Sequence, residues 1–183
     1  MDRAVDVITT PIGHYVLAAS ERGLTHIAPA SHAALEASDR PSAQSQHHLE
    51  RARSALAAYF AGTRQGFGDL ALDAAGTAFQ QRVWKALREL PFGATLSYGE
   101  LAQRIGRDGA ARAVGAANGS NPLAIVVPCH RVLGADGSLT GYAHGVERKR
   151  WLLDHEAADG CSSATRPRES LAGPRPVRAR ASA

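Results

Sequence analysis

The sequence Ile125-Val126-Val127-Pro128-Cys129-His130-Arg131-Val132 decides how the rest of the chain is interpreted. Its first three residues form an apolar run that predicts a buried strand, and the cysteine follows where that strand would end. Ends of strands and the turns after them are where folds present reactive groups. A neighbouring imidazole can take the proton of a thiol and so produce the nucleophilic thiolate. The pattern therefore predicts a reactive Cys129 with His130 as its base.

The chain has two cysteines, and the second is Cys161, among glycine and serine residues near the C-terminus. This placement favours a chemical role for Cys129 over a disulfide. Adjacent side chains point to opposite sides of a strand. Cys129 and His130 therefore need a sharp turn at Pro128, or a bridging water, to exchange a proton. A histidine base also needs a carboxylate behind it, and spacing alone leaves three candidates open: Glu147, Asp154 and Glu156.

Length and composition limit the class of protein. A chain of 183 residues, 44% of them hydrophobic, supports one ordinary domain or two small domains that share an interface. No apolar run is long enough to span a bilayer, the N-terminus lacks a signal-peptide pattern, and few cysteines suit a reducing compartment. We therefore expect a cytoplasmic protein without a membrane partner. The 21 Lys+Arg against 17 Asp+Glu permit nucleic-acid binding without requiring it.

The first part of the chain predicts a small sheet followed by a helix. Residues from about 4 to 29 alternate between apolar and polar, and turn signals at residues 10–13 and at Gly23 divide them into a meander of three strands. Apolar residues between 49 and 60 fall at helical spacing, and Gly62 ends the helix. This part, to about residue 75, offers no candidate nucleophile, phosphate loop or metal cluster.

The second part, residues 76 to 157, predicts a helical unit. Thr77-Ala78-Phe79-Gln80 is a capping box, in which the threonine and glutamine side chains satisfy free backbone amides at the start of a helix. Ser97-Tyr98-Gly99-Glu100 repeats this pattern for a short helix that ends at Gly106. A further helix is predicted from about residue 108 to 117. Two short helices joined at a glycine are typical of a helix-turn-helix.

The further helix consists of glycine, alanine and valine with one long side chain, Arg112. A helix that recognises a DNA sequence needs several long polar side chains to reach base edges, which disfavours a winged-helix transcription factor. Small residues could instead pack closely against the protein core. Because a reactive cysteine lies nearby in sequence, we favour a surface that approaches DNA without reading its sequence. The minor groove, which is narrow and carries a degenerate code, suits such a surface.

The chain resembles the O6-alkylguanine-DNA alkyltransferase family, also called the methylated-DNA–protein-cysteine S-methyltransferase family. The resemblance covers about residues 77 to 156 in the right order and spacing, and it rests on several independent motifs. The motifs are Trp84-Lys85-Ala86-Leu87, Phe92-Gly93, Ser97-Tyr98-Gly99-Glu100-Leu101-Ala102, Ala111-Arg112-Ala113-Val114-Gly115, Asn121-Pro122, Pro128-Cys129-His130-Arg131-Val132, Gly141-Tyr142 and Leu152-Leu153-Asp154-His155-Glu156.

The resemblance implies a mixed α/β (α+β) fold. Residues 1–75 would form a ribonuclease-H-like sheet domain, which the N-terminal part resembles more loosely. Residues 76–157 would form a helical, winged helix-turn-helix-like domain that carries the reactive cysteine. Residues 158–183, rich in Arg, Pro, Ser and Ala, would be a disordered tail.

The function implied by the resemblance is DNA repair by direct reversal. The family binds double-stranded DNA through the minor groove, independently of sequence, and flips the damaged base into a pocket. The alkyl group of O6-alkylguanine, and by extension of O4-methylthymine, would then pass once and irreversibly to Cys129. We expect a monomer without a cofactor, and no metal, because the zinc ligands of vertebrate members have no counterpart in this sequence.

The resemblance also implies roles for single residues. Cys129 would be the acceptor, His130 would deprotonate it through a water, and Glu156 would orient His130. Asn121 would hold the active-site turn, and Arg112 would fill the space left by the flipped nucleotide. The same resemblance implies a further set of contacts to the base and the groove: Tyr98, Val132, Tyr142 and Ala143 at the base, with Ala111, Ala113 and Gly115 beside Arg112 at the DNA.

Two positions depart from the family pattern. Ala143 stands where vertebrate members have serine, which removes a side-chain hydrogen bond to O6, and His144 replaces a small residue and could narrow the pocket. We expect methyl adducts to be accepted and leave bulky ones open. Two other interpretations use the same residues. One is a cysteine hydrolase built on Cys129, His130 and Glu156. The other is a damage-marking protein, although such relatives lack a cysteine at the acceptor position.

Overall fold

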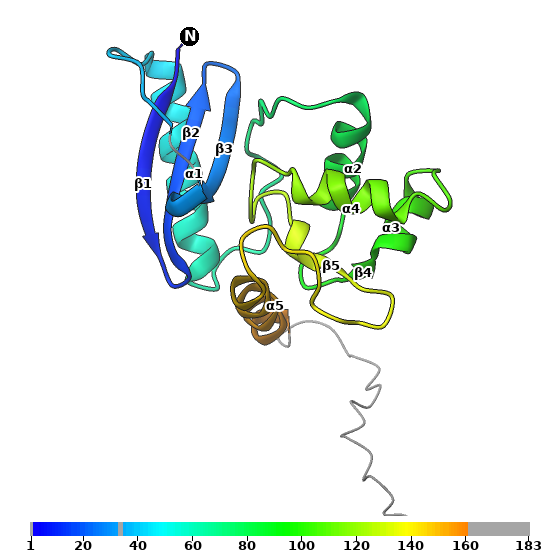
Figure 1. Cartoon of the computed structure of the whole chain (residues 1–183). Helices are drawn as coiled ribbons and strands as arrows, with labels where there is room; N and C mark the ends of the chain where they lie inside the picture. Colours follow the sequence, from blue (N-terminus) through cyan, green and yellow to red (C-terminus); the bar gives the residue numbers. More distant parts are fainter. Residues whose placement is uncertain (1, 33–34, 161–183) are drawn as a thin grey trace, which may run out of the picture.

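Three antiparallel strands form a sheet in the N-terminal part of the computed structural model, which describes residues 2–32 and 35–160 (Figure 1). The strands are β1 (Ala4–Thr10), β2 (Gly13–Ser20) and β3 (Gly23–Pro29), and β2 lies in the centre. The turns fall at the predicted positions, and Gly13 and Gly23 have positive φ angles, which glycine adopts without strain. The predicted meander is therefore confirmed.

The long helix α1 (Ala43–Phe60) packs against this sheet, after a short 3₁₀ turn, η1 (Ala30–His32). The helix begins earlier than the apolar spacing from residue 49 suggested. The reason is Ser42, whose hydroxyl accepts a hydrogen bond from the amide of Ser45 and caps the helix. A polar first turn supplies no apolar periodicity, so the pattern shows only the buried part of such a helix.

The C-terminal part contains the helices α2 (Ala78–Arg88), α3 (Tyr98–Arg104), α4 (Ala111–Gly119) and α5 (Val146–Gly160). The capping boxes predicted at Thr77 and Ser97 are both formed. Helix α4 begins later than predicted because Gly109 has a φ of +77° and interrupts the helical backbone. Helix α5 continues through Gly160, so the predicted tail cannot begin at residue 158, and the rest of that tail lies outside the described residues.

The apolar run from 125 to 127 was expected to be a strand, and this prediction is wrong. The run lies in a buried turn, in which the amide of Val127 donates to the carbonyl of Leu123 at 2.9 Å. Ile125 has a φ of +72°, which a β-branched residue rarely adopts. A short apolar run indicates burial and does not by itself distinguish a strand from a turn.

This turn is hydrogen-bonded to the free edge of β3, which joins the two parts of the chain. The amide of Ile27 donates to the carbonyl of Pro122 at 2.7 Å, and the amide of Ala124 donates to the carbonyl of Ile27 at 2.9 Å. A small parallel pair, β4 (Leu96–Ser97) with β5 (Val132–Leu133), fixes the start of α3 beside the segment that follows Cys129. The sheet edge and this pair thus hold the cysteine segment from both sides.

A single cluster of buried hydrophobic residues continues from the sheet and α1 into the C-terminal helices. Its fully buried members include Leu17 and Ile27 from the sheet, and Leu87, Leu123 and Leu152 from the C-terminal part. Among the described residues, no helix is both long and apolar enough to cross a membrane.

Candidate active site

Cys129 begins a 3₁₀ turn, η2 (Cys129–Arg131), and only 3% of its surface is exposed. Two asparagines hold its backbone. Asn118 donates from Nδ2 to the carbonyl of Cys129 at 3.2 Å, and Asn121 donates from Nδ2 to the carbonyl of Val127 at 2.9 Å. The Oδ1 atom of Asn121 also accepts from the amide of Leu123 at 3.0 Å. Asn121 therefore closes the turn that presents the thiol.

Burial raises the pKa of the Cys129 thiol, and polar neighbours offset this only in part, with Asn121 first and Lys149 and Tyr142 contributing less. Desolvation disfavours the charged form of a thiol. The thiol at rest is therefore protonated at neutral pH, and a base must remove its proton during the reaction. Lys149 itself is fully buried, and its Nζ donates to the carbonyls of Val132 at 2.6 Å and Thr140 at 2.9 Å.

His130 is fully buried, and its Nε2 atom lies 2.8 Å from Oε1 of Glu156. Of the carboxylates that spacing left open, Glu156 is therefore the one that contacts the histidine, whereas Asp154 and Glu147 are exposed. Burial lowers the pKa of His130, with Glu156 acting in the opposite direction. A neutral imidazole that donates from Nε2 to a carboxylate has Nδ1 free to accept a proton. That Nδ1 atom is buried and has no hydrogen-bond partner within the described residues.

Glu156 is 1% exposed and binds Arg131 as well as His130. Arg131 donates from Nε to Oε2 at 2.7 Å and from Nη2 to Oε1 at 2.9 Å. The amide of Gly93, which has a φ of +71°, donates to Oε2 at 3.1 Å. Burial by itself would raise the pKa of Glu156, but His130 and Arg131 reverse this and lower it to about 2. The carboxylate of Glu156 is therefore ionised in the folded protein at neutral pH.

Sequence reasoning assigned no role to Arg131, Asn118, Lys149 or Tyr59, although all of them contact this group of residues. Tyr59 donates from its hydroxyl to Oε1 of Glu156 at 2.9 Å, and it comes from α1 in the N-terminal part. Arg131 could have been noticed as a cation next to the predicted base. The position of Tyr59 in sequence carries no such signal, because only the fold brings it to Glu156.

A narrow pocket next to Cys129 is formed by the end of α4 and the loop before α5. Its lining residues are Asn118, Gly119, Asn121, Cys129, Gly141, Tyr142, Ala143 and His144. The structure thus places Tyr142 and Ala143 in one pocket with Cys129, as the resemblance implied. His144 packs edge-on against Tyr142, with ring centroids 5.3 Å apart. Burial, together with His32 and Arg148, lowers the pKa of His144 to about 4, so this ring is neutral at physiological pH.

Tyr98 borders the same region from the start of α3. Its hydroxyl donates to the carbonyls of Thr140 and Gly141, each at 3.3 Å. Gly141 has a φ of +70°, and a Cβ placed there would lie 2.9 Å from the Tyr98 hydroxyl, so only glycine fits without strain. Burial raises the pKa of Tyr98, and the nearby Cys129 adds to this effect. Tyr98 therefore keeps its proton at neutral pH.

Helix α4 carries the predicted DNA-contacting residues away from the core. Arg112 and Ala113 are exposed, and Ala111 and Gly115 are half-buried. Residues three or four positions apart share one face of a helix. Arg112, Gly115 and Gly119 therefore form one stripe, which leads from the exposed arginine to the pocket over about 10 Å. Arg112 makes no ion pair within residues 2–32 and 35–160.

Tyr98 and Val132 are the predicted base contacts outside the lining of this pocket, and Val132 directly follows the turn η2. It is fully buried, its amide donates to the carbonyl of Cys129, and its own carbonyl accepts from Lys149 at 2.6 Å. A carbonyl has two lone pairs, so the main chain of Val132 retains capacity for one more donor.

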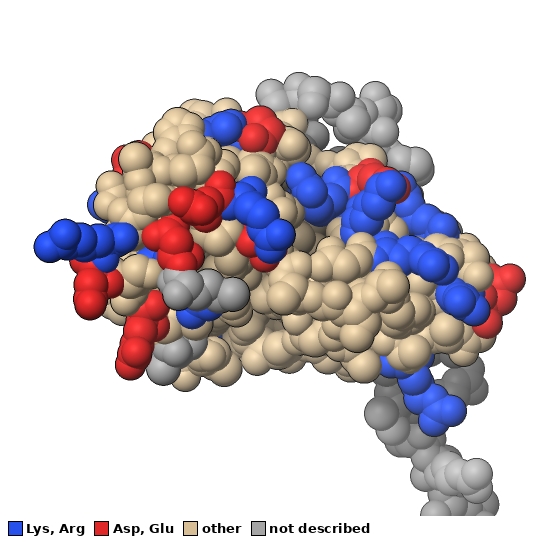
Figure 2. Space-filling model, turned by 90° about the horizontal axis from the view of Figure 1, so that it is seen from above, with Lys and Arg blue, Asp and Glu red and all other residues tan. Residues whose placement is uncertain are grey.

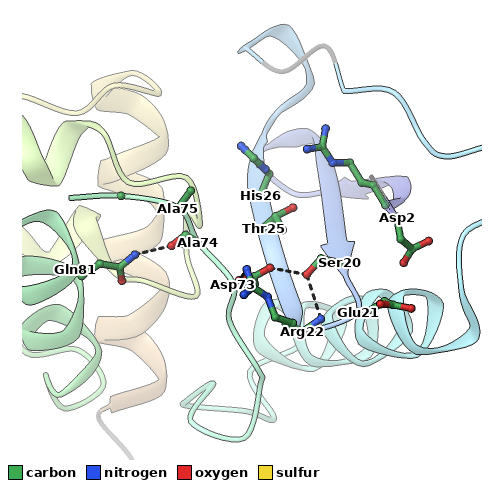
Figure 3. Close-up of a pocket in the computed structure, with 12 residues that line it drawn as sticks. Asp2, Ser20, Glu21, Arg22, Thr25, His26, Asp73, Ala74, Ala75 and Gln81 are labelled. Carbon is green, nitrogen blue, oxygen red and sulfur yellow. Dashed lines mark hydrogen bonds and ion pairs between the residues drawn. The ribbon is translucent and has the colours of Figure 1, made fainter. Parts of the chain in front are cut away.

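A larger cleft, of about 670 Å³, lies elsewhere, between β3 and the start of α2 (Figure 3). Thr25 and His26 line it on one side and Gln81 on the other, while Asp73 is held by Ser20 at 2.6 Å and by Arg22 at 2.7 Å. Cys129 and His130 are not among its lining residues. The chemistry is therefore assigned to the smaller pocket, because Cys129 lines it and is followed in sequence by His130, which contacts Glu156.

Lys and Arg side chains gather over the C-terminal part of the face shown in Figure 2. In the C-terminal part, helix α2 carries three exposed cations, Arg82, Lys85 and Arg88, and no acidic residue. Such a surface attracts polyanions. Among the described residues, no group of His, Cys, Asp and Glu is arranged to hold a metal ion.

Two domain families of known proteins match this chain. The model of the 6-O-methylguanine DNA methyltransferase DNA-binding domain matches residues 78–158, and that of the ribonuclease-like domain matches residues 5–74. The methylated-DNA--protein-cysteine methyltransferase of Salmonella typhimurium is 60% identical over 101 residues, which are 55% of this chain and 59% of that protein. The match thus spans about three fifths of the length of this relative.

Other relatives are covered more fully. The methylated-DNA--protein-cysteine methyltransferase of Mycolicibacterium paratuberculosis is 47% identical over 158 residues, which are 86% of this chain and 94% of that protein. The structure of Mycobacterium tuberculosis OGT in complex with DNA superposes with a TM-score of 0.75 at 49% identity, over 84% of this chain and 92% of that one. The chain belongs to the 6-O-methylguanine DNA methyltransferase family.

Proposed function

We propose that this protein repairs O6-alkylguanine in double-stranded DNA by irreversible transfer of the alkyl group to Cys129. The observation that carries the proposal is the buried arrangement of a thiol, a neutral His130 and an ionised Glu156 at the end of the small-residue stripe on α4. Membership of the family supports it, as does the DNA complex of the M. tuberculosis relative.

The reaction is a displacement at the alkyl carbon. The thiol proton of Cys129 passes through a water to Nδ1 of His130, and Glu156 stabilises the imidazolium that forms. Sulfur bonds to the alkyl carbon while the bond from that carbon to O6 breaks, and its electron pair stays on the base. The Tyr98 hydroxyl donates the proton that makes guanine a better leaving group, and Tyr98 and His130 then exchange protons with solvent.

The product is a thioether, and neither an imidazole nor a carboxylate cleaves a carbon–sulfur bond. Each molecule therefore reacts once. Asn121 keeps the turn in place during the reaction, while Tyr142, the amide of Ala143 and main-chain groups of Cys129 and Val132 surround the base. The same displacement applies to O4-methylthymine, whose methyl group is also on an exocyclic oxygen.

Access to the base requires that it leave the duplex. Helix α4 approaches the minor groove, because Ala111, Ala113 and Gly115 allow close contact and carry no base-reading groups. Arg112 fills the gap in the stack left by the flipped nucleotide. Recognition is therefore independent of sequence, and exposed cations such as those of α2 add electrostatic affinity. The protein acts as a monomer, since every group in the proposed reaction comes from one chain.

The test is the intact mass of the protein after incubation with a slight excess of duplex that contains O6-methylguanine. We expect a gain of one methyl group per chain, mapped to Cys129, that saturates at one equivalent. Cys129→Ser should show no gain, and Cys161→Ser, which alters the other cysteine, should react as the unaltered protein does. Tight lesion binding without a mass gain would indicate damage marking, and turnover of a thioester or amide substrate would indicate a hydrolase.

A further inference from the structure

Glu156 is the meeting point of groups from both parts of the chain. Its Oε1 atom accepts from Nε2 of His130 at 2.8 Å, from Nη2 of Arg131 at 2.9 Å and from the hydroxyl of Tyr59 at 2.9 Å. His130 and Arg131 belong to the cysteine segment. Tyr59 belongs to α1, 97 positions away from Glu156. The hydrogen bond from Tyr59 therefore brings the N-terminal part into direct contact with the carboxylate that supports the proposed base.

The ring of Tyr59 packs among other aromatic side chains. It is fully buried and lies edge-on to Phe60 at 5.3 Å and to Phe92 at 6.2 Å, with Phe67 at 5.4 Å and His155 at 5.0 Å. A phenylalanine would make the same ring contacts. A buried hydroxyl, by contrast, costs free energy unless it is hydrogen-bonded. The hydroxyl is therefore the part of Tyr59 that packing does not explain, and its acceptor is the catalytic carboxylate.

We propose that Tyr59 is a positioning residue for methyl transfer: its hydroxyl fixes Oε1 of Glu156 toward His130 and moderates how strongly that oxygen attracts the imidazole proton. This inference rests on the proposed function. A hydrogen bond to a carboxylate is charge-assisted and directional, so it restricts rotation of the carboxyl group. It also withdraws charge from Oε1, which the imidazole shares. The N-terminal part thus contributes the Tyr59 hydroxyl to the site, in addition to packing against the C-terminal part.

Removal of this hydroxyl should make His130 easier to protonate. The charged groups that act on His130 are Glu156, which raises its pKa, and Arg131 and Lys149, which lower it, while burial is the largest influence and lowers it. Other titratable groups close by are Cys129 and Tyr142, whose pKa values burial raises, and His155, whose ring lies 5.0 Å from that of Tyr59. With fewer donors on Oε1, the carboxylate holds the imidazolium proton more strongly. The base is then protonated, and inactive, at a higher pH than in the unaltered protein.

The experiment uses the full chain with Tyr59→Phe and measures single-turnover methyl transfer from duplex O6-methylguanine between pH 5 and 9. We expect the rate at neutral pH to fall by about tenfold and the acidic limb of the profile to move up by roughly half a pH unit. Affinity for the duplex should be unchanged, because Tyr59 is buried away from α4. The matched control is Phe60→Leu, which disturbs the same aromatic cluster but leaves the hydroxyl, and it should keep the acidic limb of the unaltered protein.

A second measurement does not depend on activity. The pKa of His130, followed by NMR of the imidazole in the free protein, should be higher in Tyr59→Phe than in the unaltered protein or in Phe60→Leu. An unshifted pKa, or a pH profile that coincides with that of the unaltered protein, would overturn the positioning role. Absence of methyl transfer from the unaltered protein at every pH would instead refute the proposed function, so the two failures are distinguishable.

Discussion

Cys129 is buried, and burial opposes the ionisation that its proposed chemistry requires. The proposed base, His130, is also buried and neutral. Neither the thiol nor the imidazole is therefore charged before the substrate binds. A thiol in this state reacts slowly with small electrophiles. The flipped base, by displacing solvent and placing an alkyl carbon beside the sulfur, would supply the condition in which proton transfer becomes favourable.

Arg112 gives the prediction that separates DNA handling from chemistry. It is the exposed long side chain of the α4 stripe and does not line the cysteine pocket. Arg112→Ala should slow repair of duplex O6-methylguanine by about tenfold or more, because the flipped state loses the group that fills the stack. Reaction with the free base O6-methylguanine should change by less than about twofold, because no flipping is needed. Single-turnover rates on both substrates decide this, and equal losses would contradict it.

Residue-level prediction of a contact agrees with the structure for His130 and Glu156, whose side chains are hydrogen-bonded. Cys129 and His130 are adjacent, and the resemblance to a family supplied Glu156 where spacing left Glu147 and Asp154 equally open. It failed for Tyr59 and for the bidentate pairing of Arg131. Both depend on contacts between segments that only the fold brings together, and a tyrosine on the apolar side of a helix indicates no more than a buried position.

At the scale of single elements, helix α4 has a glycine, Gly115, in its interior, where glycine is less stable than alanine. A Cβ added at Gly115 would lie 3.7 Å from the ring of Tyr98, which is an ordinary contact. Gly115→Ala should therefore raise the free energy of unfolding by about 0.5–1 kcal/mol, because alanine loses less backbone entropy in a helix. Chemical denaturation measures this. A decrease would show that Tyr98 and α4 are packed more tightly than this distance indicates.

The positions of the elements were largely predictable, whereas two boundaries and one assignment were not. Capping residues at Thr77 and Ser97 marked helix starts correctly, because a cap is a local interaction. The start of α4 was missed because Gly109 adopts a positive φ that alanine-rich sequence does not reveal. The sequence showed that the run 125–127 is buried, and we therefore predicted a strand. It did not show the hydrogen bonds of Asn121 that hold this run in a turn.

For the molecule as a whole, the buried ionisable groups predict instability in acid. Burial alone would raise the pKa of Glu156, but His130 and Arg131 lower it to about 2 from an ordinary 4.5, so the stability it contributes is present above pH 4.5 and is lost as the pH falls toward 2. Burial lowers the pKa of His130 below its ordinary 6.5. The unfolded chain therefore binds that proton first, which also favours unfolding as the pH falls.

The free energy of unfolding should accordingly decline below about pH 6.5 and more steeply below pH 4.5, with about 3 kcal/mol attributable to Glu156. Denaturant titrations across this range measure the decline. Glu156→Gln, which cannot titrate at this position, should show a shallower decline below pH 4.5 from a lower starting stability. Parallel curves for the two proteins would contradict the assignment.

The hydrogen bonds between β3 and the turn before Cys129, together with the position of Glu156 on the last described helix, also determine when during folding the thiol acquires its base. Chains emerge from the ribosome N-terminus first, and contacts between distant segments form late because closing long loops costs entropy. The sheet and α1 can assemble early, but Glu156 reaches His130 only when α5 docks. A partly made chain therefore carries Cys129 as an ordinary thiol, and nucleophilic capacity appears only on completion of the fold.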